Sequence, residues 1–163
     1  MPISTQRLLE VAVEAARTGG THALRNKSRR EEMIRSYAHD VKLALDVECQ
    51  ARIESVIQSH FPDHQILGEE DDTLTDGKRL GDTKSTGQES YHYEWIVDPI
   101  DGTVNFSHGF PIWSCSIAVR RGEEVLAGAV YAPDLDALYT ATVDQPSTRN
   151  GEPIHVSTRD DIS

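Results

Sequence analysis

The chain has 163 residues, of which 37% are hydrophobic and 26% are charged, and its formal net charge is -11. This length suits one domain that buries about two thirds of the surface of its unfolded chain, and no apolar run is long enough to cross a bilayer. The acidic balance disfavours nucleic-acid partners, and the amino-terminal segment lacks the basic start and continuous apolar core of a signal peptide. We therefore expect a soluble cytoplasmic protein without nucleic-acid or membrane partners.

Two amphipathic helices are predicted in the first part of the chain. Apolar residues recur at helical spacing from about residue 4 to residue 26, and a second stripe of Val47, Ala51, Ile53, Val56 and Ile57 follows. The second stripe ends where Pro62 disfavours helix at the preceding residue. Residues 27–40 are expected to form a charged connection between the two helices.

The rest of the chain predicts a largely antiparallel sheet. A short strand at 65–68 precedes the polar segment 71–92, which has almost no apolar periodicity and is expected to be a loop. Short turns separate the strands that follow, so these strands should be antiparallel neighbours. The expected ranges of these strands are 93–97, 114–120, 124–132 and 137–141.

The carboxyl-terminal segment predicts a turn at Asn150-Gly151 and a short strand at 154–156. Residues 157–161 then have the pattern of a helix N-cap followed by acidic residues of a first turn, although the chain does not continue into that helix. Two interpretations stay open. The segment is either a frayed polar tail, or the chain stops partway through its fold.

Several residues that could suggest chemistry are expected to be structural. Cys49 and Cys115 fit small buried hydrophobes in a reducing compartment, and Trp95 and Trp113 lie in strand patterns that favour the core. Four histidines have no Ser or Cys partner in a recognisable motif, so surface or structural roles are expected for them. They are His60, His64, His92 and His108.

The segment WIVDPIDGTVNF, residues 95–106, places carboxylates directly after an apolar strand. Pro99 fixes its own φ and favours an extended Asp98, so the strand projects this carboxylate before the chain turns. Asp101 follows at the turn, and Gly102 opens a short helix whose free N–H groups form a positive dipole end. Because carboxylates are rarely buried unless they are paired or hold a metal, this corner could hold cations and an anion together.

The oxygen ligands at this corner favour a hard divalent cation. The carboxylates of Asp98 and Asp101 and the carbonyl of Ile100 suit Mg²⁺ or Mn²⁺ better than Zn²⁺, because no Cys/His set has zinc spacing. Glu70, at the end of another strand, could complete the site, and a phosphate could bind at the helix N–H groups. The pattern therefore indicates metal-assisted phosphoryl transfer to water. Common turn dipeptides and a solvated acidic loop at 69–72 remain the alternative explanation.

The sequence GEE followed by WIVDPIDGTVNF resembles the signature of the inositol monophosphatase family over its full twelve residues. The resemblance continues through FPDHQILGEE, FPIWSCSIAV, GAVYAP and NGEPIHVS. It implies a layered α/β sandwich of the inositol monophosphatase/sugar phosphatase type, with amino-terminal helices packed on a largely antiparallel sheet. On this resemblance, residues 1–163 form a single amino-terminal metal-binding portion of the domain, and the carboxyl-terminal α/β half is absent.

The resemblance also implies how the metals are held. At the matching positions, Glu70, Asp98 and the carbonyl of Ile100 would hold a first metal, and Asp98 and Asp101 would hold a second. Glu70 could also touch a third metal. The family's downstream Trp-Asp motif, which supplies a further metal aspartate, is absent from this sequence.

Roles in catalysis and phosphate binding follow from the same resemblance. Thr103 and Asp46 would orient the attacking water, and Glu70 would take part through its metals. The amides of Gly102 and Thr103 would bind the phosphate, and Asp101 could reach a substrate hydroxyl. Two departures from the family pattern are Arg35, where a lysine is frequent, and Leu43, where a threonine is familiar.

We therefore expect a magnesium-dependent, lithium-sensitive phosphatase, with Mn²⁺ as a second candidate metal. It would hydrolyse a small phosphate monoester, inositol monophosphate first, and would be a homodimer when complete. Fructose-1,6-bisphosphatase, histidinol phosphatase and bisphosphate nucleotidase activities are alternatives that share the metal core. A truncated, non-catalytic metal-binding or interaction module is the alternative of a different class.

Overall fold

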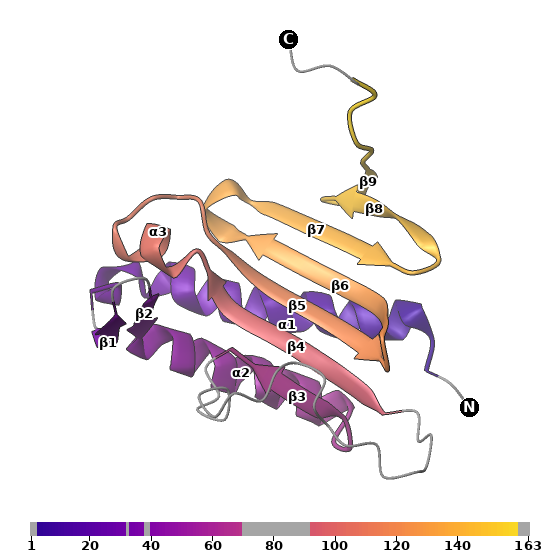
Figure 1. Cartoon of the computed structure of the whole chain (residues 1–163), viewed down its shortest axis with the longest axis horizontal. Coiled ribbons are helices and arrows are strands. Elements are labelled where there is room, and N and C mark those ends of the chain that lie inside the picture. The colour runs from indigo at the N-terminus through magenta and orange to yellow at the C-terminus, as the bar shows by residue number, and fades with distance from the viewer. Residues whose placement is uncertain (1–2, 32, 38–39, 70–91, 160–163) are drawn as a thin grey trace.

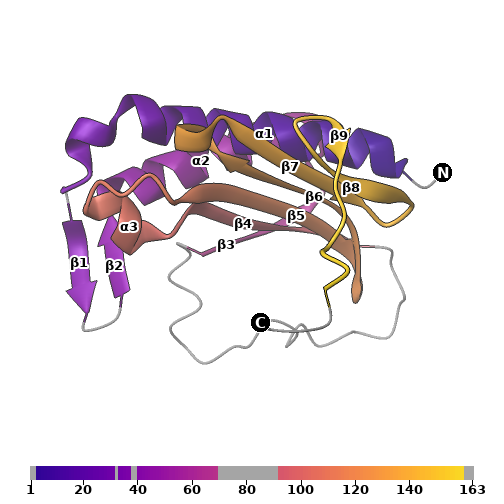
Figure 2. The same cartoon turned by 90° about the horizontal axis from the view of Figure 1, so that it is seen from above.

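The computed structural model describes residues 3–31, 33–37, 40–69 and 92–159. Two long helices, α1 (Thr5–Arg25) and α2 (Ala44–His60), lie on one face of a seven-stranded sheet (Figure 1). The view in Figure 2 shows both helices on the same side of the sheet, with the chain after the last strand running toward the other side. This arrangement confirms the predicted layered α/β fold.

The sheet has the strand order β3-β4-β5-β6-β7-β8-β9, and only the β3–β4 pair is parallel. A largely antiparallel sheet was expected and is confirmed. Its strands are β3 (Gln65–Gly68), β4 (Tyr93–Asp101), β5 (Ser114–Arg121), β6 (Glu124–Ala132), β7 (Ala137–Thr142), β8 (Gln145–Arg149) and β9 (Glu152–Pro153). The smaller elements are η1 (Lys27–Arg29), β1 (Met33–Tyr37), β2 (Asp40–Leu43), α3 (Thr103–Ser107) and η3 (Pro133–Leu135).

Helix α1 begins and ends where its sequence predicts. The Ser4 side chain accepts a hydrogen bond from the Arg7 N–H at 3.2 Å, and Asn26 forms the carboxyl-terminal cap. The helix contains two glycines because its buried face approaches its neighbours closely. A Cβ atom at Gly19 would lie 2.6 Å from Ile53 Cδ1, and one at Gly20 would lie 2.8 Å from the Tyr131 ring.

The core consists of two clusters of buried side chains. The larger cluster joins α1 and α2 to the middle of the sheet and includes Trp95, which is fully buried. The smaller cluster lies at the end of β4 beside α3 and includes Ile100, Phe106 and Trp113. Both tryptophans are therefore core residues, as predicted.

The two cysteines are buried and free. Burial raises the pKa of the Cys49 thiol to about 12 and also raises the pKa of Cys115. Both residues therefore behave as small apolar side chains, as expected. Among the helices that the structure describes, none is long and apolar enough to cross a membrane.

Three expectations about local structure were wrong. Residues 27–40 contain a 3-10 turn and most of the β1–β2 hairpin rather than a plain connection. The predicted stripe of α2 is only partly buried, because Val47 is 42% exposed and Ala51 is exposed, whereas Cys49 is buried. Residues 154–156 are not a strand, because β9 ends at Pro153. The loop expected at 71–92 lies, apart from its last residue, outside the described residues.

Candidate metal and phosphate site

The acidic corner lies where β4 ends beside β5. Asp98 is opposite Ser116 and Asp101 is opposite Ser114, so β4 carries one extra residue between these pairs. Such a bulge turns a strand locally and redirects its side chains. Strand β4 consequently continues to Asp101 instead of ending near Val97, and it delivers both carboxylates to the start of α3.

The turn into α3 depends on Gly102, which has a φ of 88°. Residues with a side chain rarely adopt this left-handed conformation, and a Cβ atom here would also lie 3.2 Å from the Ile112 carbonyl oxygen. The Phe106 N–H donates to the Gly102 carbonyl at 3.0 Å and closes the first turn of the helix. The predicted phosphate-binding residues Gly102 and Thr103 therefore form the amino-terminal end of α3.

Asp98 is the partly buried carboxylate at the centre of this corner. Its Oδ1 atom is buried and has no hydrogen-bond partner among the described residues. Burial is the largest cause that raises the pKa of Asp98 to about 8, and a hydrogen bond and the charge of Glu69 follow, with smaller contributions from Asp101 and Asp46. A buried carboxylate surrounded by other carboxylates is a chemically suitable place for a divalent cation.

Glu69 is a residue of this corner that the sequence did not single out. Its N–H donates to the Val97 carbonyl at 2.9 Å, next to the parallel pair of Gly68 and Val97. Because parallel strands have their carboxyl ends at the same edge of a sheet, the end of β3 brings Glu69 to Asp98. The sequence signal was the GEE motif, but the expected ligand there was Glu70.

Glu70 lies outside the described residues. Within the described part of the chain, no group of three or more His, Cys, Asp or Glu side chains is arranged to hold a metal ion. The charge of Asp101 acts on Asp98, and the participation of Glu70 stays a prediction. Asp101 is exposed, and its Oδ2 accepts a hydrogen bond from the Ser114 hydroxyl at 3.4 Å.

The Thr103 hydroxyl donates to the Ile100 carbonyl oxygen at 2.9 Å. This contact joins two of the predicted site residues, since Ile100 was expected to offer its carbonyl to a metal and Thr103 to orient water. Asp46 lies in the first turn of α2, is 1% exposed, and accepts a hydrogen bond from the Leu43 N–H at 3.1 Å through Oδ2. Its charge reaches Asp98, but the pairing of Asp46 with Thr103 stays a prediction.

The four histidines named above are surface or structural residues, as expected, and His92 and His108 are exposed. His64 is stacked between Phe61 and Tyr93, with ring centroids at 4.5 and 4.7 Å, and its Nδ1 accepts a hydrogen bond from Trp95 Nε1. Burial lowers the pKa of His64. His60 joins the surface of α2 to that of α1 through Glu14 at 3.0 Å.

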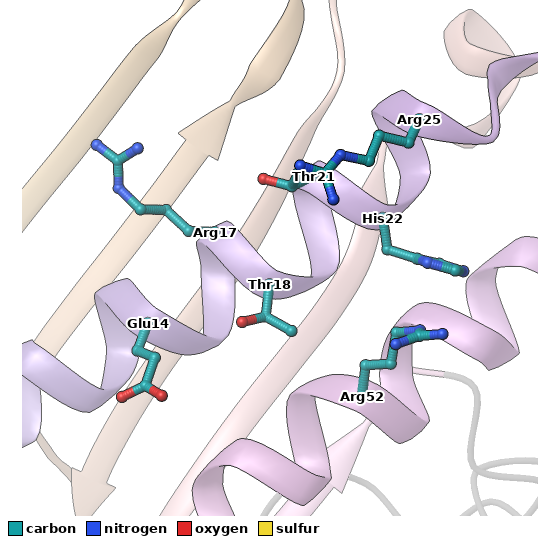
Figure 3. A pocket seen from close by; sticks show the side chains of 7 residues that line it. All are labelled: Glu14, Arg17, Thr18, Thr21, His22, Arg25 and Arg52. Carbon is teal, nitrogen blue, oxygen red and sulfur yellow. The ribbon is translucent and has the colours of Figure 1, made fainter.

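A separate hollow of about 470 Å³ lies between the outer faces of α1 and α2 (Figure 3). The guanidinium group of Arg17 lies 5.1 Å from the centre of the Tyr131 ring, and His22 is held by Glu48 at 3.1 Å. No residue of the acidic corner lines this hollow, so it is not part of the candidate site. Its lining residues are Glu14, Arg17, Thr18, Thr21, His22, Arg25 and Arg52.

The fold and the corner together define an α/β protein with a candidate divalent-cation site at the end of a sheet strand. The sequence profile of the inositol monophosphatase family matches residues 4–163, and the chain therefore belongs to this family. The family that the sequence motifs suggested is thus confirmed.

Similar proteins agree with this assignment. Inositol monophosphatase 1 of Solanum lycopersicum is 33% identical over 159 residues, which cover 98% of this chain and 55% of the relative. Fructose-1,6-bisphosphatase/inositol-1-monophosphatase of Aquifex aeolicus is 35% identical over 159 residues, covering 96% of this chain and 55% of the relative. The chain thus spans about half the length of the curated relatives it matches.

Solved structures show the same fold. The extragenic suppressor protein suhB of Bartonella henselae matches with a TM-score of 0.78 and 28% identity, covering 94% of this chain and 55% of that chain. The IMPase of Thermotoga maritima matches with a TM-score of 0.76 and 32% identity, covering 94% of this chain and 54% of that chain. The layered architecture of the chain is therefore that of inositol monophosphatases.

Proposed function

We propose that the whole protein hydrolyses a small phosphate monoester with the help of Mg²⁺ or Mn²⁺, and that inositol monophosphate is the first substrate to test. The observation that carries this proposal is the buried Oδ1 atom of Asp98, which has no hydrogen-bond partner in the part of the chain that the structure describes and lies among neighbouring carboxylates. Membership of the inositol monophosphatase family and the names of the tomato and Aquifex relatives support the reaction class.

The cation would be held by Asp98, Asp101, the carbonyl of Ile100, and Glu70, which lies outside the described residues. These are hard oxygen donors, which Mg²⁺ and Mn²⁺ prefer. When bound, such a cation lowers the pKa of water and offsets negative charge on phosphoryl oxygens. Asp98 must lose its proton to serve as a ligand, so its raised pKa makes metal affinity depend on pH.

Other residues of the corner would hold the substrate. The N–H groups of Gly102 and Thr103 at the start of α3 would bind the phosphate, as free backbone donors at a helix start can. The Thr103 hydroxyl would orient the attacking water with Asp46, because its oxygen keeps lone pairs that can accept a hydrogen bond from water while it donates to the Ile100 carbonyl. Asp101 is exposed and could accept a hydrogen bond from a substrate hydroxyl.

Phosphate release from inositol phosphates, sugar phosphates and nucleotide bisphosphates, with and without Mg²⁺ or Mn²⁺, tests this proposal. Asp98→Asn should abolish turnover, since it removes a charge from the proposed bridging ligand. Asp63→Asn is the matched control, because Asp63 is exposed and lies outside the corner. The absence of metal-dependent phosphate release from all three substrate classes would contradict the proposal.

A second substrate is suggested by one of the relatives. The name of the Aquifex relative combines two activities, which supports fructose 1,6-bisphosphate as the second substrate to test.

A cytoplasmic homodimer without a nucleic-acid or membrane partner remains our proposal for the whole protein. A truncated, non-catalytic metal-binding or interaction module is the alternative of a different class. Metal binding without turnover would identify this alternative.

A further inference from the structure

Trp113 lies just before β5, between the acidic corner and η3. Its indole Nε1 donates to Asp134 Oδ2 at 2.5 Å, and the Lys27 ammonium group donates to Asp134 Oδ1 at 2.6 Å. Trp113 is 4% exposed and the Asp134 side chain is 14% exposed, so water competes little for these contacts. One carboxylate therefore joins Trp113 to the segment that follows α1.

The other side of Trp113 packs against the start of α3. The rings of Phe106 and Trp113 meet edge to face, with centroids 4.8 Å apart and planes at 78°. The backbone at Gly102 lies so close that an added Cβ atom would be 3.5 Å from Trp113 Cα. A hydrogen bond also connects α3 to the segment before β5, because Asn105 Nδ2 donates to the Ile112 carbonyl oxygen at 2.8 Å.

Helix α3 depends on these contacts for its position. It has only five residues, and so short a helix is not stable without tertiary packing. Phe106 is its buried residue, and Trp113 is the aromatic partner of Phe106. The orientation of the first N–H groups of α3 is therefore set largely by where Trp113 is held.

We infer that Asp134 and Trp113 are positioning residues of the phosphate site. The contact of Lys27, Asp134 and Trp113 holds the turn at Gly102 and Thr103 in the orientation that phosphate binding and turnover require. This inference rests on the proposed phosphatase function. It concerns residues that touch neither the substrate nor the metal, and that act through the packing of α3.

The two tryptophans offer a matched pair of variants. Both are buried, and both donate an indole hydrogen bond, Trp113 to Asp134 and Trp95 to His64 at 2.9 Å. Trp113→Phe should lower kcat about tenfold and raise KM, because misplaced binding groups hold both the substrate phosphate and the transition state less well. Trp95→Phe should lower the melting temperature to a similar extent but leave kcat within about twofold, because Trp95 belongs to the other core cluster.

Variants of Asp134 separate the hydrogen bond from simple packing. Asp134→Ala should lower kcat as much as Trp113→Phe, and the double variant should be no worse than either single variant. Asp134→Asn keeps an acceptor for the indole and should recover most of the lost kcat. The Trp113 indole N–H resonance, followed by NMR, should shift in Asp134→Ala while that of Trp95 stays in place.

Equal kcat values for Trp113→Phe and Trp95→Phe, with an active wild-type protein, would overturn this inference alone. The same holds if Asp134→Ala shifts the Trp113 resonance without lowering kcat. A wild-type protein that releases no phosphate from any monoester, with Mg²⁺ or Mn²⁺ present, would instead overturn the proposed function, and this inference would fall with it.

Discussion

Asp98→Asn should make the metal-free protein more stable while removing its metal binding. In the folded protein the pKa of Asp98 is raised from 3.8 to about 8 by burial and by neighbouring carboxylates. The folded state therefore binds the Asp98 proton more tightly than the unfolded state does. It follows that the free energy of unfolding decreases as pH rises from about 4 to about 8, and that the full penalty applies above that range.

The size of this penalty follows from the same shift. A tenfold difference in proton affinity corresponds to about 1.4 kcal/mol, so the unscreened penalty at high pH is on the order of 5 kcal/mol. Asp98 retains partial contact with solvent, and screening should reduce the penalty to about 2 kcal/mol. Replacement of the charge by a neutral amide should thus raise the melting temperature by about 5 °C at pH 8.5 and by little at pH 5.

Thermal unfolding of both proteins at pH 5 and pH 8.5, without metal and with excess Mg²⁺, measures this effect. Mg²⁺ should stabilise the wild-type protein and leave Asp98→Asn unchanged, because a ligand stabilises only the state that binds it. Asp63→Asn, at an exposed position, should follow the wild-type protein under all four conditions. If Asp98→Asn is less stable than the wild-type protein at pH 8.5 without metal, the electrostatic account of this corner is wrong.

Three further predictions concern single contacts. Thr103→Ala should lower kcat about a hundredfold with metal affinity nearly intact, since the hydroxyl that it removes is proposed to orient water and not to bind metal. Equal losses of metal affinity and kcat, measured by calorimetry and steady-state kinetics, would refute this role. Gly19→Ala should cost about 2 kcal/mol in urea unfolding, because its Cβ would lie 2.6 Å from Ile53 Cδ1. An unchanged midpoint would mean that the Ile53 side chain can move aside without loss of stability. Ser4→Ala should cost about 1 kcal/mol through the lost cap, and Ser4→Asp should restore it; an equal loss in both variants would exclude capping.

The long helices and the central strands could be predicted from the sequence because local patterns determine them. Helix α1 has a continuous apolar stripe between Ser4 and Asn26, and strand β6 was predicted with its observed ends. Strand β8 was not expected, since its residues 145–149 are mostly exposed and show no apolar alternation. The buried face of α2 was misjudged because helical spacing alone does not say which of two adjacent stripes meets the sheet.

The candidate site could be predicted in part for a similar reason. Asp98, Asp101 and Gly102 are close in the sequence, so their turn and helix start follow from local chemistry. The approach of Glu69 depends on the parallel pairing of β3 with β4, which no local pattern specifies. The contact between Trp113 and Asp134 likewise requires that η3 and the start of β5 meet in three dimensions.

The close packing of α1 against α2 and the sheet has a consequence for the dynamics of the molecule. Its glycine face lies against α2 on one side and against β6 on the other, and it also contacts β4, β5 and β7. Most buried residues of α1 belong to the larger core cluster and Ala23 belongs to the smaller one, so α1 cannot move away without opening the core. We therefore expect these elements to exchange their amide hydrogens as one cooperative unit. Strands β8 and β9 and the short helix α3 lie outside this unit. The acidic corner thus lies where β4, which belongs to this unit, meets α3, which is held through Phe106 in the smaller core cluster, so the amides around Asp98 and the amides proposed to bind phosphate should report on two different opening reactions.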